Sequence, residues 1–242
     1  MNEADALEHD GFAIVPDIIG PELLDTLSQT LDTLRPGGAV LERGGRVYAS
    51  RDLLREAPET RRLAGSDALL DLVRPVLGPA AFVVRALLFD KTVEANWPVP
   101  WHQDLTVAVR ARTEAPGYGP WTVKGGVTHV RPPVSVLERM LTIRVHLDDC
   151  RAESGPLRVV PGSHASGKLD AGATRDWLER VPARTCLVPR GGVLLMRPLL
   201  LHASSPADAP GRRRVIHLEY AADPLPGGVA WFEVPPRETR PR

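Results

Sequence analysis

A regular alternation of apolar and polar residues between positions 140 and 147 is the feature that most restricts the fold of this chain. The apolar members are Leu141, Ile143, Val145 and Leu147. A period of two is typical of a β-strand. Further short apolar runs, separated by Gly- and Pro-rich turn signals, occupy residues 81–91, 101–109, 157–160, 184–188, 193–196, 199–203 and 213–221. Many short strands joined by polar turns predict an antiparallel sandwich or barrel.

The first 80 residues differ from the rest because helical spacing dominates them. Leucines recur at helical intervals between residues 21 and 34, and a second helix is expected to run from its N-cap, Ser66, to about residue 77. Pro75 disfavours the last turn of that helix, and residues 11–16 are expected to form one short strand. The sequence therefore predicts a mainly β protein of α+β composition, whose N-terminal helices cover one sheet.

The length of 242 residues suits a single domain. We expect residues 1–80 to support a β core at residues 81–222. Residues 223–242 are expected to form a tail that Trp231 and Phe232 attach to the fold. Residues 110–136 are rich in glycine, proline and aromatic residues. A loop of this length is usually functional or mobile, so we expect a lid there.

Composition argues against several classes of protein. Thirty Lys and Arg residues balance thirty Asp and Glu residues, whereas a protein that binds nucleic acid through its phosphates normally has a basic excess. No run of 18 apolar residues indicates a membrane span, and no signal peptide is visible. The two cysteines, Cys150 and Cys186, are too few for a disulfide scaffold and suit a reduced, cytoplasmic setting.

Two His-x-Asp triplets, at residues 102–104 and 146–148, are candidates for metal binding. Residues i and i+2 of a strand share a face, so the histidine and the carboxylate of one triplet can reach the same ion. The first triplet precedes the predicted lid and would lie at the mouth of a barrel. The second lies inside the regular strand, where we expect His146 to be a hydrogen-bonded residue of the barrel lining. Either triplet alone can arise by chance.

A third ligand should come from a distant strand, because closing a barrel brings such strands together. His202 is the leading candidate, although a lone histidine in an apolar run is more often a core residue. Two histidines and one carboxylate would form the facial triad of non-haem Fe(II) oxygenases. Iron of this kind needs an electron-supplying co-substrate, and 2-oxoglutarate can chelate it.

The distal carboxylate of 2-oxoglutarate then needs a cationic partner, and an arginine binds a carboxylate through two parallel hydrogen bonds. Arg213 follows His202 after a short turn. We expect its strand to be the antiparallel neighbour of the strand that carries His202. Ser204 would share the face of His202 and add a hydroxyl. At least one member of Arg212–Arg214 is expected to belong to a solvated basic turn.

These residues resemble the phytanoyl-CoA dioxygenase family of Fe(II)- and 2-oxoglutarate-dependent oxygenases, from about residue 11 to residue 220. The resemblance is carried by the segments WHQD (101–104) and GPLRVVPGSH (155–164), together with His202 and Arg213. It implies a double-stranded β-helix, which is a jelly-roll or cupin-like barrel, with flanking N-terminal helices. It also implies that His102, Asp104 and His202 bind Fe(II).

The same resemblance implies that Arg213 and Ser204 bind the distal carboxylate of 2-oxoglutarate. Leu87 and Lys91 are similar to residues of the strand that lines the co-substrate site. Arg144 stands where many members have an aromatic residue, and could contact the co-substrate, the substrate or a carboxylate. The PGSH segment is similar to a structural turn of the family, so His164 is not expected to be a ligand.

The presence of Asp104 favours hydroxylation, because related halogenases have a small residue at this position. The expected reaction uses O2 and releases succinate and CO2 from 2-oxoglutarate. The substrate is expected to be a small molecule, and a cationic wall would suit a polar or anionic one. Candidate substrate-binding residues are Arg85, Tyr118, Trp121, Lys124, His129 and His146.

Two other functions remain open at this point. One is a cupin-type metal enzyme that does not use 2-oxoglutarate, and the other is a non-catalytic jelly roll that binds a ligand or partner. The residues do not reveal the oligomeric state.

Overall fold

The computed structural model describes residues 2–208 and 211–233. Its helices are α1 (Glu3–His9), α2 (Pro21–Asp32), α3 (Leu53–Glu56), α4 (Glu59–Ala64), α5 (Asp67–Leu77), α6 (Val134–Glu138) and α7 (Ala171–Arg180). The first strands are β1 (Phe12–Val15), β2 (Val40–Arg43), β3 (Arg46–Ser50), β4 (Phe82–Lys91), β5 (Val99–His102), β6 (Val107–Val109), β7 (Trp121–Lys124) and β8 (Val127–Val130). The remaining strands are β9 (Met140–His146), β10 (Leu157–Val159), β11 (Arg184–Cys186), β12 (Val193–Met196), β13 (His202–Ser204) and β14 (Arg213–Ala221).

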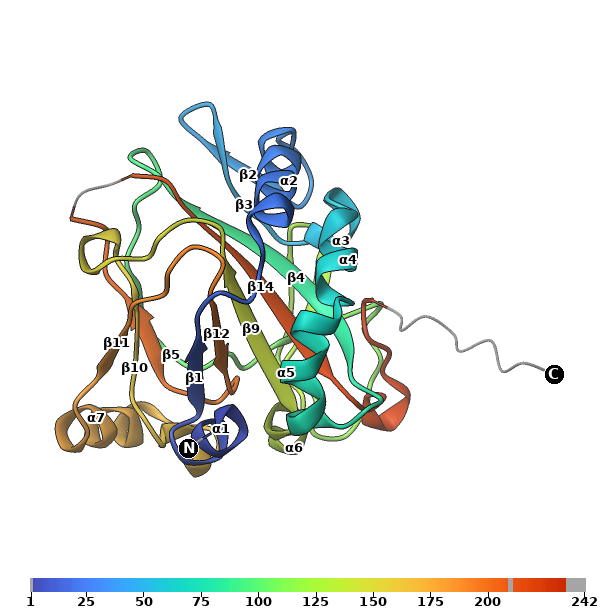
Figure 1. The fold of residues 1–242 in the computed structure, drawn as a ribbon. Coiled ribbons are helices and arrows are strands. Elements are labelled where there is room, and N and C mark those ends of the chain that lie inside the picture. Colours follow the sequence, from blue (N-terminus) through green and yellow to red (C-terminus); the bar gives the residue numbers. More distant parts are fainter. Residues whose placement is uncertain (1, 209–210, 234–242) are drawn as a thin grey trace.

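The strands form two facing sheets and a smaller third one (Figure 1). The large sheet has the order β1-β12-β9-β14-β4-β3-β2, and the facing sheet has the order β11-β10-β13-β5. A three-stranded sheet, β6-β8-β7, lies beside them. Helices α2 to α5 cover the outer face of the large sheet in Figure 1. The predicted jelly-roll fold with flanking N-terminal helices is confirmed.

The two faces of the large sheet differ in chemistry. The apolar residues of β9, such as Ile143 and Val145, belong to the main hydrophobic core beneath the helices. Thr142, Arg144 and His146 point to the opposite face and are buried as well. The polar positions of an antiparallel strand commonly meet water. Here they face the four-stranded sheet, so the predicted alternation marks a polar barrel interior.

Several element boundaries differ from the sequence prediction. The expected strand at 101–109 is divided into β5 and β6, and the run at 199–203 enters a strand only at His202. The N-terminal part contains the β2–β3 hairpin and α1, and α7 was also not predicted. Ser66 is the N-cap of α5 as expected, and Pro75 is accommodated in the helix's last turn.

The predicted lid at residues 110–136 is not an irregular loop. Strands β7 and β8 form an antiparallel hairpin within it, and β8 pairs in turn with β6. In the tail, Trp231 is buried and its Nε1 donates to the carbonyl of Asp223, 2.9 Å away. Trp231 is therefore attached to the fold as expected, and the N–H of Phe232 donates to the carbonyl of Ala108 over 3.1 Å. Residues 234–242 lie outside the described part of the chain.

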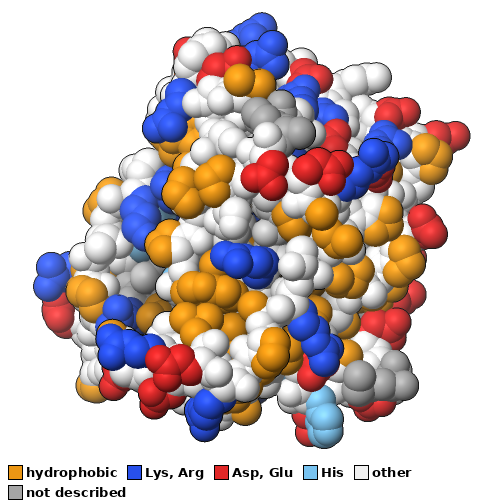
Figure 2. Space-filling view, turned by 90° about the vertical axis from the view of Figure 1, so that its left-hand side faces the viewer, with side chains coloured by type: hydrophobic (Ala, Val, Ile, Leu, Met, Phe, Trp, Pro, Cys, Tyr) orange, Lys and Arg blue, Asp and Glu red, His pale blue; other side chains and the backbone are white. Residues whose placement is uncertain are grey.

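The exterior has no broad band of one charge on the face shown in Figure 2, which lies over the four-stranded sheet. Basic and acidic side chains are interspersed there, and hydrophobic side chains gather near the middle. None of the helices within the described residues is long and apolar enough to cross a membrane.

Candidate metal centre

His102, Asp104 and His202 converge between the two facing sheets. His102 ends β5, His202 begins β13, and the two are cross-strand partners with ring centroids 4.2 Å apart. Asp104 follows β5, and its backbone N–H donates to the carbonyl of Pro198 over 2.9 Å. Its two carboxylate oxygens each lie 3.8 Å from the Nε2 of one histidine. One ligand atom from each of the three residues lies within 4.8 Å of the others.

The hydrogen bonds of the two histidines leave Nε2 free for a metal. Nδ1 of His102 lies 2.8 Å from the carbonyl of Pro100, and Nδ1 of His202 lies 2.8 Å from the carbonyl of Leu200. Because a carbonyl only accepts, each Nδ1 carries the proton and each Nε2 presents a lone pair. Burial lowers the pKa of His202 to about 4, which keeps the ring neutral. One oxygen of Asp104 is buried without a hydrogen bond. This donor set fits Fe(II).

Gln103 lies between His102 and Asp104, and its side chain holds the turn after β5 in place through three hydrogen bonds. Its side-chain amide donates to the carbonyls of Gly167 and Leu199 at 2.8 and 2.6 Å, and its Oε1 accepts from the N–H of Leu169 at 2.8 Å. Sequence reasoning assigned it no role. The only sequence signal for Gln103 is its position inside the triplet, because the two segments that its side chain contacts are distant in sequence.

The second triplet is not assembled as a metal site. His146 is buried and lines the barrel as expected, but neither ring nitrogen has a hydrogen-bond partner within the described residues, so the expected hydrogen bond is not found. Burial, followed by the charges of Arg144 and Arg213, depresses the pKa of His146 well below its usual value. Asp148 lies beyond the end of β9 and pairs instead with Arg214.

A second cluster, formed by Lys91, Ser204 and Arg213, is almost fully buried beside the triad. Nζ of Lys91 donates to Oγ of Ser204 over 3.3 Å and also to the carbonyl of Ser205. Nη1 of Arg213 donates to the carbonyl of Gly155 over 2.7 Å, while its Nε has no partner. Burial, and then the charge of Arg213, lowers the pKa of Lys91 to about 8. Two adjacent buried cations with free donors fit the carboxylate of a dicarboxylic acid.

The route by which Arg213 reaches this cluster differs from the prediction. Strands β13 and β14 are not antiparallel neighbours: β13 lies between β10 and β5 in the small sheet, and β14 lies between β9 and β4 in the large one. Arg213 is instead the register partner of Lys91. The two sheets face each other, so Arg213 approaches Ser204 across the barrel and not along a ladder.

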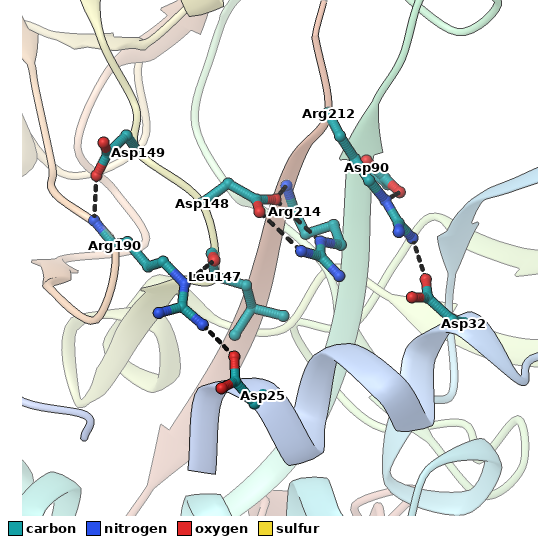
Figure 3. A network of polar contacts seen from close by, with 9 residues as sticks. All are labelled: Asp25, Asp32, Asp90, Leu147, Asp148, Asp149, Arg190, Arg212 and Arg214. Carbon is teal, nitrogen blue, oxygen red and sulfur yellow. Dashed lines mark hydrogen bonds and ion pairs between the residues drawn. The ribbon is translucent and has the colours of Figure 1, made fainter. Parts of the chain in front are cut away.

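The two neighbours of Arg213 lie on the opposite, helix-covered face of the large sheet, where acidic side chains bind them (Figure 3). Nε and Nη2 of Arg214 donate to the two oxygens of Asp148 at 2.9 and 2.7 Å. Arg212 bridges Asp90 at 2.9 Å and Asp32 at 2.6 Å. The expected solvated turn is therefore a set of ion pairs that joins β14 to β4, α2 and the turn after β9, and strand alternation directs only Arg213 inward.

Arg144 connects the two clusters. It is buried, its Nη1 lies 3.0 Å from Nδ1 of His217, and its guanidinium lies over the ring of Phe89 at 5.6 Å. Its Nε has no partner. Burial, and then the charge of Arg213, lowers the pKa of Arg144 to about 10, so the side chain stays charged at neutral pH. Leu87 is the register partner of His217 and lies on the same face of the sheet.

The remaining candidates divide into two groups. Tyr118 and Trp121 are half-buried against the second hydrophobic cluster, around Leu137 and Trp231. Lys124 and His129 instead lie near Arg85, whose charge acts on both. His129 is fully buried, and burial followed by the charge of Arg85 lowers its pKa to about 4.

Arg85 is joined to residues that sequence reasoning missed. Its Nη1 donates to Oε1 of Glu219 over 3.2 Å, and Nε2 of His217 lies 3.6 Å from the same oxygen. Glu219 and His217 occupy alternate positions of β14 with Arg213. Both residues are separated from Arg213 by an even number of positions, which places them on the same face of the strand. This spacing is the sequence signal that could have identified them.

Comparison with known proteins agrees with this geometry. The sequence profile of the family described as Phytanoyl-CoA dioxygenase (PhyH) matches residues 7–215. The chain is 24% identical to L-proline trans-4-hydroxylase of Streptomyces griseoviridis, covering 87% of this chain and 82% of that protein. It is 23% identical to ectoine dioxygenase of Sphingopyxis alaskensis over 72% of this chain, and spans 53% of the length of that relative.

Solved structures of similar fold include EctD from S. alaskensis with 2-oxoglutarate and 5-hydroxyectoine, with a TM-score of 0.73 at 20% identity over 96% of this chain and 78% of that one. The epimerase SnoN, in complex with Fe3+, alpha ketoglutarate and nogalamycin RO, has a TM-score of 0.70 at 18% identity over 98% and 90% of the two chains. The motif-based resemblance is thus confirmed, and the chain belongs to the phytanoyl-CoA dioxygenase (PhyH) family.

Proposed function

We propose that this protein is a non-haem Fe(II)- and 2-oxoglutarate-dependent oxygenase that hydroxylates a small molecule. The observation that carries the proposal is the adjacency of two donor sets. Nε2 of His102, Nε2 of His202 and the carboxylate of Asp104 face one another. Lys91, the register partner of Arg213, donates to Ser204 on the strand that carries His202, so the buried pair Lys91 and Arg213 adjoins the triad. A protein that binds a metal without 2-oxoglutarate would need only the two histidines and the carboxylate.

Each residue has a distinct task in this proposal. His102, Asp104 and His202 would hold the iron. Arg213, Lys91 and Ser204 bind the distal carboxylate of 2-oxoglutarate, and the apolar side chain of Leu87 lies against its carbon chain. Arg144 extends the cationic wall from Arg213 toward Asp104. When bound, iron, 2-oxoglutarate and O2 supply the oxidation of a C–H bond, with release of succinate and CO2.

A polar or anionic substrate is supported by the buried face of the large sheet. Arg85 and Arg144 lie there with unpartnered Nε atoms. An unpaired donor inside a protein is costly, and a polar ligand would satisfy it. The two relatives are named for ectoine and L-proline, which are both small polar molecules.

The proposal is tested by anaerobic titration of metal-free protein with Fe(II) and then 2-oxoglutarate. The expected result is a weak visible charge-transfer band from the chelate, absent in Asp104→Ala and weakened in Arg213→Ala. Arg212→Gln is the matched control, because Arg212 points outward to Asp32 and Asp90. Iron binding without any band would favour a cupin-type metal enzyme that does not use 2-oxoglutarate. No iron binding would favour a non-catalytic jelly roll.

A further inference from the structure

The inner face of the large sheet carries more positive than negative charge. Its buried cations are Arg85, Lys91, Arg144 and Arg213. Against these four stand Glu219, which is buried on the same face, and Asp104, whose side chain is 33% exposed. Within the described residues, the other buried carboxylates, Asp52 and Asp90, pair with Arg55 and Arg212 outside this interior. Two positive charges therefore remain without a protein partner.

The proposed iron and co-substrate do not remove this excess. Fe(II) adds two positive charges, and 2-oxoglutarate brings two negative ones. The loaded site would keep the same two positive charges as the protein alone. Isolated charges inside a protein are strongly unfavourable unless they are paired, so a further anion would be stabilised there.

The mouth of the barrel adds two more cations near this interior. Arg51 follows β3, and Lys124 ends β7. The turn after Lys124 packs on Arg51, because a Cβ built on Gly125 would lie 3.3 Å from Cδ of Arg51. Partial burial and the charges of Arg51 and Arg85 lower the pKa of Lys124, whereas Asp104 raises it. The packing of this turn therefore places Lys124, at the end of β7, beside Arg51. Neither Lys124 nor Arg51 forms an ion pair within the described part of the chain.

A cavity of about 210 Å³ opens beside these cations. Leu87 and Phe89 of β4 form its floor, and Tyr48 and Trp97, in edge-to-face contact at 5.3 Å, form an aromatic wall. Arg51 and Arg43 also line it, and the guanidinium of Arg43 lies 5.8 Å from the ring centroid of Tyr48. On β4, Leu87 and Phe89 lie between Arg85 and Lys91 on the inner face, so the cavity adjoins both the interior cations and the co-substrate cluster.

We propose that this cavity binds the primary substrate as an organic anion, with a carboxylate or phosphate group held by Arg51 and Lys124 and a small apolar or aromatic body on Leu87, Phe89, Tyr48 and Trp97. The assignment rests on the proposed oxygenase function, because it places the body of the ligand next to the candidate metal centre. It narrows the polar or anionic class to an organic anion with an apolar body, and it adds Arg51, which the sequence did not indicate, to the predicted candidate Lys124.

The test uses three probes with the same phenyl body: benzoate, the neutral benzamide of nearly the same shape, and phenyl phosphate, which carries the larger tetrahedral anion. Each is titrated by calorimetry into protein loaded anaerobically with Fe(II) and 2-oxoglutarate, and the chelate band is recorded in parallel. Benzoate or phenyl phosphate is expected to bind about tenfold or more tightly than benzamide, because hydrogen bonds to charged groups are the stronger ones. The stronger anion identifies the group that the site prefers.

The double variant Arg51→Gln/Lys124→Gln is expected to remove this preference and to keep the chelate band, which reports an intact fold and co-substrate site. Arg46→Gln is the matched control, since Arg46 belongs to the same hairpin but lines a different cavity on the far side of the sheet. Equal binding of benzoate and benzamide, absence of binding by any probe, or an unchanged preference in the double variant would each overturn the inference. Loss of the band in the wild type would instead refute the proposed function.

Discussion

His102 and His202 are register partners on the neighbouring strands β5 and β13, and their ring centroids lie 4.2 Å apart. Each ring is oriented by a carbonyl two residues before it, Pro100 for one and Leu200 for the other. The pair is therefore arranged before any metal binds, and its geometry depends on a β ladder that both strands share.

Replacing His102 by alanine is expected to abolish stoichiometric iron binding. Removing one of three protein ligands should weaken iron binding by more than the roughly 10- to 100-fold loss that follows removal of a group that only supports a ligand. His146→Leu is the control, because the ring of His146 has no hydrogen bond and Asp148 is bound by Arg214. Metal analysis after anaerobic loading measures both. Loss of iron in His146→Leu with retention in His102→Ala would reverse the ligand assignment.

The affinity for 2-oxoglutarate is expected to fall as the pH rises through about 8. The pKa of Lys91 is lowered to about 8 by burial and by Arg213, so the ammonium is present below this pH and is lost above it. The check is the dissociation constant of 2-oxoglutarate from pH 7 to pH 9. Lys91→Met should bind 2-oxoglutarate weakly and without this slope; an unchanged slope in the variant would show that another group titrates.

Gly155→Ala is expected to impair both the stability and the co-substrate site. Gly155 has φ +64°, and a Cβ there would lie 2.6 Å from the carbonyl oxygen of Ser205, which is rigid backbone. A non-glycine residue in this conformation costs roughly 1–3 kcal/mol. The carbonyl of Gly155 also accepts from Arg213, so its displacement should weaken 2-oxoglutarate binding. Gly211→Ala is the control, since a Cβ there meets open space. Unchanged 2-oxoglutarate binding in Gly155→Ala would show that this turn does not support the co-substrate site.

Tyr220→Phe is expected to lower the free energy of unfolding by about 1–3 kcal/mol, measured by urea denaturation. The ring of Tyr220 is fully buried, and its hydroxyl donates to the carbonyl of Ala64 over 2.9 Å, which joins β14 to the end of α4. The variant leaves that carbonyl without its partner. Tyr118→Phe loses a similar bond to Pro226, but at an exposed position. The control should change the free energy of unfolding by less than about 0.5 kcal/mol. Equal effects of the two variants would contradict this account.

Several parts of the fold could be predicted because they depend on local spacing. The strand at β9, the helix α5 with its N-cap Ser66, and the strand β14 follow from periodicity and turn chemistry. The hairpin β2–β3 could not be predicted, because its pairing with a distant strand stabilises it. In particular, β3 is a strand partly because it pairs with β4 at the sheet edge. The helix α7 has no buried residues, so it lacks the apolar stripe that periodicity detects, although Asp170 caps it locally.

For the candidate site, the sequence alone determined which residue types were present and at what spacing. The His-x-Asp triplet, the distal histidine and the arginine after it were sufficient to indicate the family. Only the tertiary structure decided that β13 and β14 lie in opposite sheets, that Lys91, the register partner of Arg213, meets Ser204 across the barrel, and that Arg85, Glu219, His217 and Arg144 form one buried network. The physical reason is that the spacing of residues along a strand determines on which face of the sheet a side chain lies. Which other side chains it meets depends on the sheet that packs over that face, and this is a property of the whole fold.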